Sequence, residues 1–193
     1  MKDTPLQLQI YYELALAIGN GTELALMLKQ SLSAYLRKLN CSAGMVLGSH
    51  CQDDGSICFA PLLTLPKRMD KNPAIQHALS MLPQTGGPNA LGSCLAQLPM
   101  KVTAETRMQI HLMALPSFGV LLLVKGGEPL PDQVIKSLQP INQKLADACH
   151  ACIQNKKIEQ LVVQLQHEVE ERAEAQRKLS RSKQKYQNIF ENI

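Results

Sequence analysis

The chain has 193 residues, a formal net charge of +4, no Trp, and only three Phe and four Tyr. So small a charge does not by itself indicate nucleic acid or a membrane surface as a partner, and so few aromatic rings argue against a stacking platform for single-stranded nucleic acid. No apolar run approaches the ~20 residues that span a bilayer. The first residues also lack the unbroken apolar stretch of a signal peptide, so we expect a cytoplasmic segment.

The chain begins with two predicted helices. Apolar residues recur at helical spacing over 6–18 and again over 24–39. Gly and Asn residues separate the two stretches, and Asn40 closes the second one.

A β-hairpin is expected next, because the period of the pattern changes. Residues 43–50 and 56–65 are typical of strands, and the sequence Gln-Asp-Asp-Gly at 52–55 is a strong turn signal between them. Pro61 indicates that the second of these strands lies at a sheet edge or contains a bulge.

The middle of the chain predicts one short helix over 73–82 and further strands. Residues 91–98 form a short apolar segment that we interpret as a strand, although the signal is weak. Residues 107–112 alternate strictly between polar and apolar, which is typical of a half-buried strand. The nearly continuous apolar run 118–125 predicts a central strand that is covered on both faces.

The last element is a long helix that starts near Pro131 and restarts or kinks near Pro140. No Gly or Pro follows Pro140 up to residue 193. The order of elements predicts an α+β fold, an antiparallel sheet flanked by helices, with the terminal helices packed together on one face and a long C-terminal coiled-coil helix.

A spacing of alternating three and four residues runs along this helix and predicts a dimer interface. A helix of ~50 residues would be ~75 Å long, and a domain of this size cannot cover one whole side of it. The phase of the spacing shifts between Cys152 and Ile158. The residues that we expect at the interface between two copies are Leu145, Ile158, Leu161, Leu165 and Leu179.

Two resemblances concern the organisation of the chain. Residues 171–179, Glu-Arg-Ala-Glu-Ala-Gln-Arg-Lys-Leu, resemble the connector helix before PAS domains, and residues 186–193 look like the opening helix of a PAS domain. The order of elements over residues 1–150 resembles a GAF-type sensor domain. The resemblance implies a GAF-like domain over 1–130, an exit helix and coiled-coil linker over 131–185, and the start of a PAS domain over 186–193.

Such proteins end in a histidine kinase, a diguanylate cyclase or a related output module. The resemblance therefore implies that PAS and output domains follow in the same chain. Neither the short motif of cyclic-nucleotide-binding GAF domains nor the Cys-His surroundings of a phytochrome-type chromophore is present.

Cysteines are the most tempting chemical groups in the sequence. Cys149 and Cys152 lie three residues apart on the last helix, a spacing that suits a redox pair or part of a metal site. Packing is the favoured interpretation, because free Cys behaves as a small hydrophobe and no second such pair completes a zinc site. We predict no metal, and the sequence does not identify a cofactor.

A ligand pocket is a second hypothesis. Arg107, Gln109 and His111 lie on the polar side of the alternating strand, where they would contact either water or a small polar ligand. Cys58 and Cys94 lie in predicted strands and either line the same cavity or pack in the core. We assign these five residues as candidate ligand contacts.

The expected function is that of a sensory input module, most often found in a sensor histidine kinase, which binds a small molecule and relays its state through a dimeric coiled coil. The alternative is a dimerisation and docking platform without a ligand. The sequence contains no recognisable assembly of nucleophile, base and cofactor loop, so we do not expect an enzyme in this segment.

Overall fold

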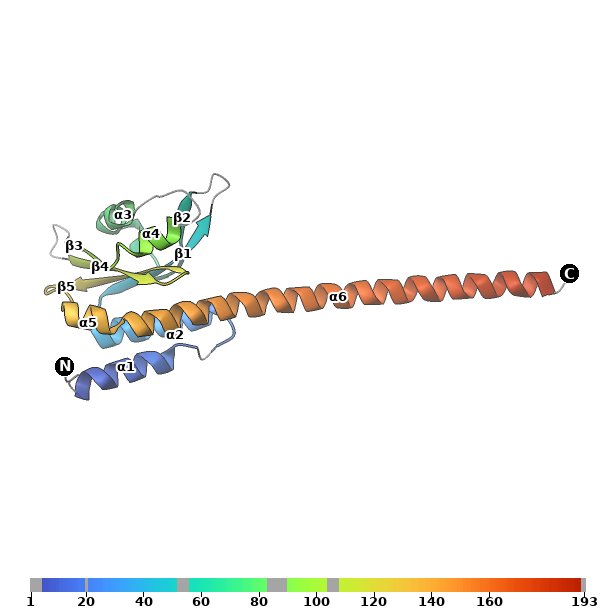
Figure 1. Cartoon of the computed structure of the whole chain (residues 1–193), viewed down its shortest axis with the longest axis horizontal. Helices are drawn as coiled ribbons and strands as arrows, with labels where there is room; N and C mark the ends of the chain where they lie inside the picture. The colour runs from blue at the N-terminus through green and yellow to red at the C-terminus, as the bar shows by residue number, and fades with distance from the viewer. Residues whose placement is uncertain (1–4, 20, 52–55, 83–89, 104–107, 192–193) are drawn as a thin grey trace. The chain divides into compact units, whose positions relative to one another are not determined.

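The computed structural model describes residues 5–19, 21–51, 56–82, 90–103 and 108–191 (Figure 1). The elements follow in the order α1 (Pro5–Ala17), α2 (Leu24–Leu39), β1 (Ala43–Cys51), β2 (Ile57–Leu65), a 3₁₀ turn (Met69–Lys71), α3 (Pro73–Ser80), α4 (Ala90–Leu95), β3 (Met100–Thr103), β4 (Met108–Leu115), β5 (Gly119–Gly126), α5 (Asp132–Ser137) and α6 (Gln139–Glu191). The chain divides into two compact units, Met1–Cys152 and Ile153–Ile193. The predicted α+β class is confirmed.

The first unit is built on a five-stranded antiparallel sheet with the strand order β2-β1-β5-β4-β3. The strand β5 lies in the middle, and six successive residues from Gly119 to Val124 are buried. This confirms the central strand that the apolar run 118–125 predicts. Because both faces of a central strand are covered, its sequence shows no polar alternation.

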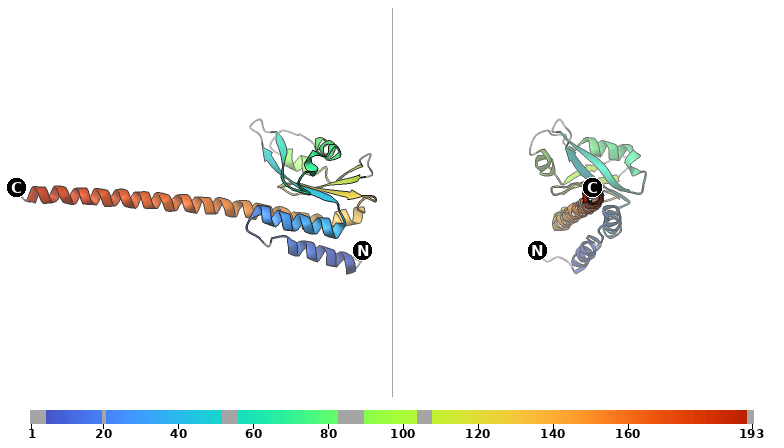
Figure 2. Two further views of the ribbon diagram at one scale, coloured as in Figure 1. Left: turned by 180° about the vertical axis from the view of Figure 1, so that it is seen from behind. Right: turned by 90° about the vertical axis from the view of Figure 1, so that its right-hand side faces the viewer.

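Helices cover both faces of the sheet (Figures 1 and 2). The helices α3 and α4 lie over one face, where Ile75 and Ala78 of α3 join a core with Met45, Ile110 and Leu122 of the strands. The helices α1, α2 and α5 and the first turns of α6 lie on the opposite face. The terminal helices therefore share one face, as predicted.

The strand β4 differs from its prediction as a half-buried strand. His111, Leu112 and Met113 are all buried. The alternation of sequence over 107–112 correctly indicates a strand, but it does not show whether a second layer of helices covers the polar side. That layer is present here.

The segment 91–98 was predicted as a strand, and this is wrong: α4 ends at Leu95, and β3 follows only at Met100. An apolar run this short gives no periodicity that separates a helix from a strand. The strand β3, Met100–Thr103, was not predicted because its four residues give too short a pattern.

Local signals confirm several element ends. The Asn72 side chain accepts a hydrogen bond of 2.9 Å from the Ala74 N–H and caps α3. Asn40 ends α2 in the left-handed conformation, with φ of 53°. Val46 pairs with Leu63 whereas Leu47 pairs with Pro61, so a bulge lies at the predicted place in an edge strand. The predicted turn 52–55 lies outside the described residues.

Gly119 is required where β1 and β5 approach each other. A Cβ atom on this residue would lie 2.0 Å from the backbone oxygen of Leu47. No side chain fits at that distance, so the spacing of these two strands depends on glycine.

The division of the chain after Cys152 differs from the predicted boundary after residue 130. The helix α5 and the first turns of α6 bury Ile135, Leu138 and Leu145 in the first unit. The second unit consists of the remainder of α6 from Ile153 to Glu191.

Candidate functional site

A pocket of about 430 Å³ lies between the hairpin β1–β2 and the helix α3. This volume falls in the range of ~300–1,000 Å³ that is usual for small-molecule sites. The residues that line it are Met45, Leu47, Ile57, Cys58, Phe59, Pro61, Gln76, Leu79, Ser80 and Leu82. Of the four predicted ligand contacts that the structure describes, Cys58 alone lines this pocket.

The lining of this pocket, named here the hairpin pocket, is mostly apolar with a few polar groups. Met45 and Leu47 on β1 are almost fully buried and also belong to the core on this face of the sheet. Gln76 and Ser80 contribute an amide and a hydroxyl from α3, and Cys58 contributes a half-buried thiol from β2. None of the described side chains that line it is charged. The pocket therefore suits an uncharged or weakly polar molecule with a large apolar part.

His111 lies outside the hairpin pocket and is 1% exposed. The Leu130 backbone N–H donates a hydrogen bond of 3.2 Å to its Nε2 atom, so the proton of the neutral ring is on Nδ1. That Nδ1 atom has no hydrogen-bond partner among the described residues. Burial, and to a smaller extent the charges of Lys101 and Lys125, lowers the pKa of His111 to about 4. His111 is a neutral, buried residue near physiological pH.

Gln109, the second polar residue of β4 in the predicted set, forms a hydrogen bond within the sheet. The Gln109 Oε1 atom accepts a hydrogen bond of 2.9 Å from the hydroxyl of Thr103 on the neighbouring strand β3. Arg107 lies outside the described residues. Neither Gln109 nor His111 lines the hairpin pocket.

Cys94 lies on α4 rather than on a strand, and it is fully buried. Burial raises the pKa of its thiol above the usual value. The residue does not line the hairpin pocket. It packs as a small apolar side chain, which was the alternative interpretation of its role.

Cys149 and Cys152 are both buried on α6 within the first unit. Burial, and to a smaller extent Cys152, raises the pKa of the Cys149 thiol to about 12. The Cys152 thiol donates to the backbone oxygen of Gly21 at 3.4 Å. Because metal binding and redox exchange need the thiolate, these groups are suited to packing instead. Among the described residues, no cluster of three His, Cys, Asp or Glu side chains has the geometry of a metal site.

No family model matches the sequence, and no curated protein matches it. Among solved structures, the chain is similar to the N-acylhomoserine lactone-dependent LuxR-family transcription factor CepR2 of Burkholderia cenocepacia. The two sequences are 14% identical, the TM-score is 0.45, and the similarity covers 76% of this chain and 95% of that chain. At this level, the similarity assigns neither a family nor a ligand.

The second unit exposes a row of large apolar side chains on α6. These are Ile158, Leu161, Val162, Leu165, Val169 and Leu179, each between 46% and 72% exposed. Val163 is 65% exposed on another side of the helix. Four of the five residues that were predicted at a dimer interface are in this set. An exposed apolar row along a charged helix is the usual mark of a surface that another helix covers.

Leu145, the fifth predicted interface residue, is 1% exposed in the first unit. It packs in the core of its own chain, and we remove it from the set that contacts a second copy. The spacing before Cys152 matches intramolecular packing, whereas the spacing from Ile158 onwards leads to exposed residues. Val162 and Val169 belong to the exposed row and were missed, although the four-residue steps from Ile158 and Leu165 would have found them.

No helix among the described residues is both long enough and apolar enough to cross a membrane.

Proposed function

We propose that this chain is the sensory input module of a bacterial, cytoplasmic signal-transduction protein. A small molecule with a large apolar part binds in the hairpin pocket, and its presence biases the pairing of α6 with the same helix of a second copy. The observation that carries the proposal is the uncharged, mostly apolar hairpin pocket of about 430 Å³, which has an amide, a hydroxyl and a thiol in its wall. We propose no chemical reaction for this segment.

The spacing of the exposed row supports the proposed pairing of two copies. Ile158, Leu165 and Leu179 are separated by multiples of seven residues, and Val162 and Val169 lie four residues after the first two of these. A heptad with β-branched residues at one seam position and Leu at the other favours a parallel, two-stranded coiled coil. Two parallel copies would place the same downstream sequence side by side.

The output is proposed from the resemblance of the last residues to the connector and opening helix of a PAS domain. PAS and output domains would follow in the same chain, and the output would be a histidine kinase or a diguanylate cyclase. Polar residues such as Arg172 and Gln176 occupy seam positions of the same heptad. They keep the pair marginally stable, so that two registers lie within a few kcal/mol of each other.

A pair of matched tryptophan variants tests whether a ligand binds in the hairpin pocket. Ser80→Trp fills the hairpin pocket from α3, whereas Ser93→Trp places the same side chain on the exposed surface of α4. Each purified chain is incubated with a bacterial metabolite extract, washed and denatured, and the released small molecules are weighed by mass spectrometry. We expect a compound retained by the wild type and by Ser93→Trp but lost from Ser80→Trp. Equal retention by all three proteins would place the ligand elsewhere.

A ligand-free dimerisation and docking platform is the second candidate function. The exposed row on α6 favours it, because pairing along that row needs no ligand. In this case no compound is retained, and Ser80→Trp leaves the output of the longer protein unchanged.

A further inference from the structure

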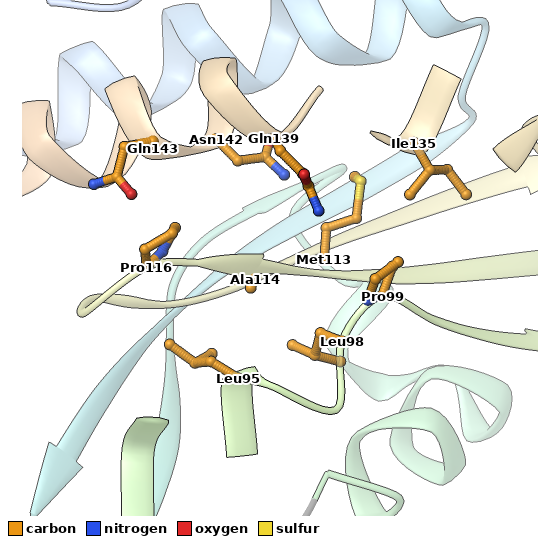
Figure 3. A pocket seen from close by; sticks show the side chains of 10 residues that line it. All are labelled: Leu95, Leu98, Pro99, Met113, Ala114, Pro116, Ile135, Gln139, Asn142 and Gln143. Carbon is orange, nitrogen blue, oxygen red and sulfur yellow. The ribbon is translucent and has the colours of Figure 1, made fainter. Parts of the chain in front are cut away.

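A second pocket of about 320 Å³ lies at the edge of β4 (Figure 3). The strand β3 pairs with β4 only as far as Leu112, while β4 continues to Leu115. Among the described residues, no strand therefore pairs with Met113 and Ala114 on the β3 side of β4. The apolar part of the lining consists of Leu95, Leu98, Pro99, Met113, Ala114, Pro116 and Ile135. This site, named here the edge pocket, shares no residue with the hairpin pocket.

The polar part of the edge pocket consists of three amides on the first turns of α6. Figure 3 shows Gln139, Asn142 and Gln143 on the helix side, opposite Leu95 and Leu98. Gln139 and Gln143 are exposed, whereas Asn142 is only 3% exposed. A buried amide at the wall of a pocket differs from a solvated surface residue, because its orientation is fixed by the protein.

Tyr35 fixes the orientation of the Asn142 amide. The Tyr35 hydroxyl, itself fully buried on α2, donates a hydrogen bond of 2.8 Å to Asn142 Oδ1. Burial raises the pKa of Tyr35, so the hydroxyl keeps its proton and acts as the donor. Since Oδ1 is occupied from the α2 side, the Nδ2 donors of Asn142 are left for the pocket side (Figure 3).

The chemistry of the lining defines the class of ligand. None of the described residues that line the edge pocket is charged, so a charged ligand would lose its hydration without gaining an ion pair from them. The one buried polar group offers donors, which a carbonyl oxygen satisfies. We propose that the edge pocket binds an uncharged small molecule whose carbonyl oxygen accepts a hydrogen bond from Asn142 Nδ2 and whose apolar part contacts Leu98 and Met113.

Such a ligand would contact the helix α6 directly. Gln139, Asn142 and Gln143 belong to the first turns of α6, and Tyr35 connects Asn142 to α2. The edge pocket is therefore placed to influence the packing of these two helices, whatever binds in the hairpin pocket.

The test uses N-butylacetamide as the probe and nuclear magnetic resonance of the ¹⁵N-labelled full chain. A probe this small is expected to bind with a Kd of about 1 mM. We expect the side-chain NH₂ signals of Asn142 to shift with the backbone signals of Leu98 and Met113. Butylammonium and pentanoate carry the same butyl group together with a charge, and they should shift these signals at least ~10-fold more weakly.

Two variants separate the edge pocket from other sites. Asn142→Asp keeps an oxygen for Tyr35 but removes the NH₂ donors, and it should weaken binding at least ~10-fold. Gln139→Trp fills the pocket from an exposed helix position, with Gln133→Trp as the surface control, so the test does not depend on the folding of one buried variant. Cys58→Ala, in the hairpin pocket, should leave binding unchanged. Absence of a shift at Asn142 at saturating probe, or equal binding by Gln139→Trp and Gln133→Trp, would overturn the proposal.

Discussion

Acidification should destabilise the first unit through His111. The residue is buried and neutral, with its Nε2 atom accepting from the Leu130 N–H. In the unfolded chain the ring takes up a proton near its ordinary pKa of 6.5, whereas in the folded chain it does so only near pH 4. The unfolded state therefore binds more protons between these two values, and stability falls as the pH falls through this window.

The size of the effect follows from the difference in pKa. Each pKa unit corresponds to about 1.4 kcal/mol, so the change from 6.5 to about 4 corresponds to about 3 kcal/mol as an upper bound. This contribution is fully present above pH 6.5 and is lost by about pH 4. It is a large part of the ~5–15 kcal/mol that typically stabilises a folded domain.

The assay is urea unfolding at a series of pH values. Tyrosine fluorescence monitors the unfolding, because the chain has no Trp. The control is His111→Gln, which retains an acceptor for Leu130 but does not titrate. Other groups also titrate in this window, so the decisive quantity is the difference in free energy of unfolding between the two proteins as a function of pH. We expect this difference to change by up to about 3 kcal/mol from pH 7 to pH 4. Parallel curves would refute the assignment of His111 as a buried neutral residue.

Further predictions concern packing, pairing and thiol reactivity. Gly119→Ala should lower the free energy of unfolding by at least ~2 kcal/mol in urea melts, because its Cβ has no room; a neutral effect would contradict the strand spacing. Tyr35→Phe should cost about 1–2 kcal/mol by leaving a buried amide oxygen unpaired, measured in the same way. Leu165→Pro should leave the first unit folded, as measured by tyrosine fluorescence, but should abolish dimers in light scattering. Unchanged output from the full-length mutant would count against signal transfer through paired α6 helices. Iodoacetamide at neutral pH should label Cys58 well before Cys149, because burial keeps the Cys149 thiol protonated. Peptide mass spectrometry measures the labelling of each cysteine.

Local sequence signals predict much of this fold because they act over a few residues. The cap at Asn72, the left-handed Asn40 and the bulge opposite Pro61 each follow from the chemistry of one residue. The shift of helical phase between Cys152 and Ile158 is also informative. It coincides with the end of the first unit, where intramolecular packing gives way to an exposed row.

The features that the sequence does not predict depend on contacts between distant segments. His111 appears as a polar residue of an alternating strand, and only the helical layer above it shows that it is buried. The same holds for Leu145, whose spacing suits either a second copy or its own core. Asn142 has no local signal at all, because its partner Tyr35 lies 107 residues away in the sequence.

Native mass spectrometry of the purified chain, followed by denaturing mass spectrometry of the same sample, tests the proposed sensor most directly. For a chain of 21.3 kDa, we predict a dimer that carries a stoichiometric additional mass, which is released as a small molecule on denaturation. A monomer without added mass would contradict both the pairing of α6 and the binding of a ligand. A dimer that never carries added mass, even after exposure to metabolite extract, would contradict the sensor and favour the docking platform.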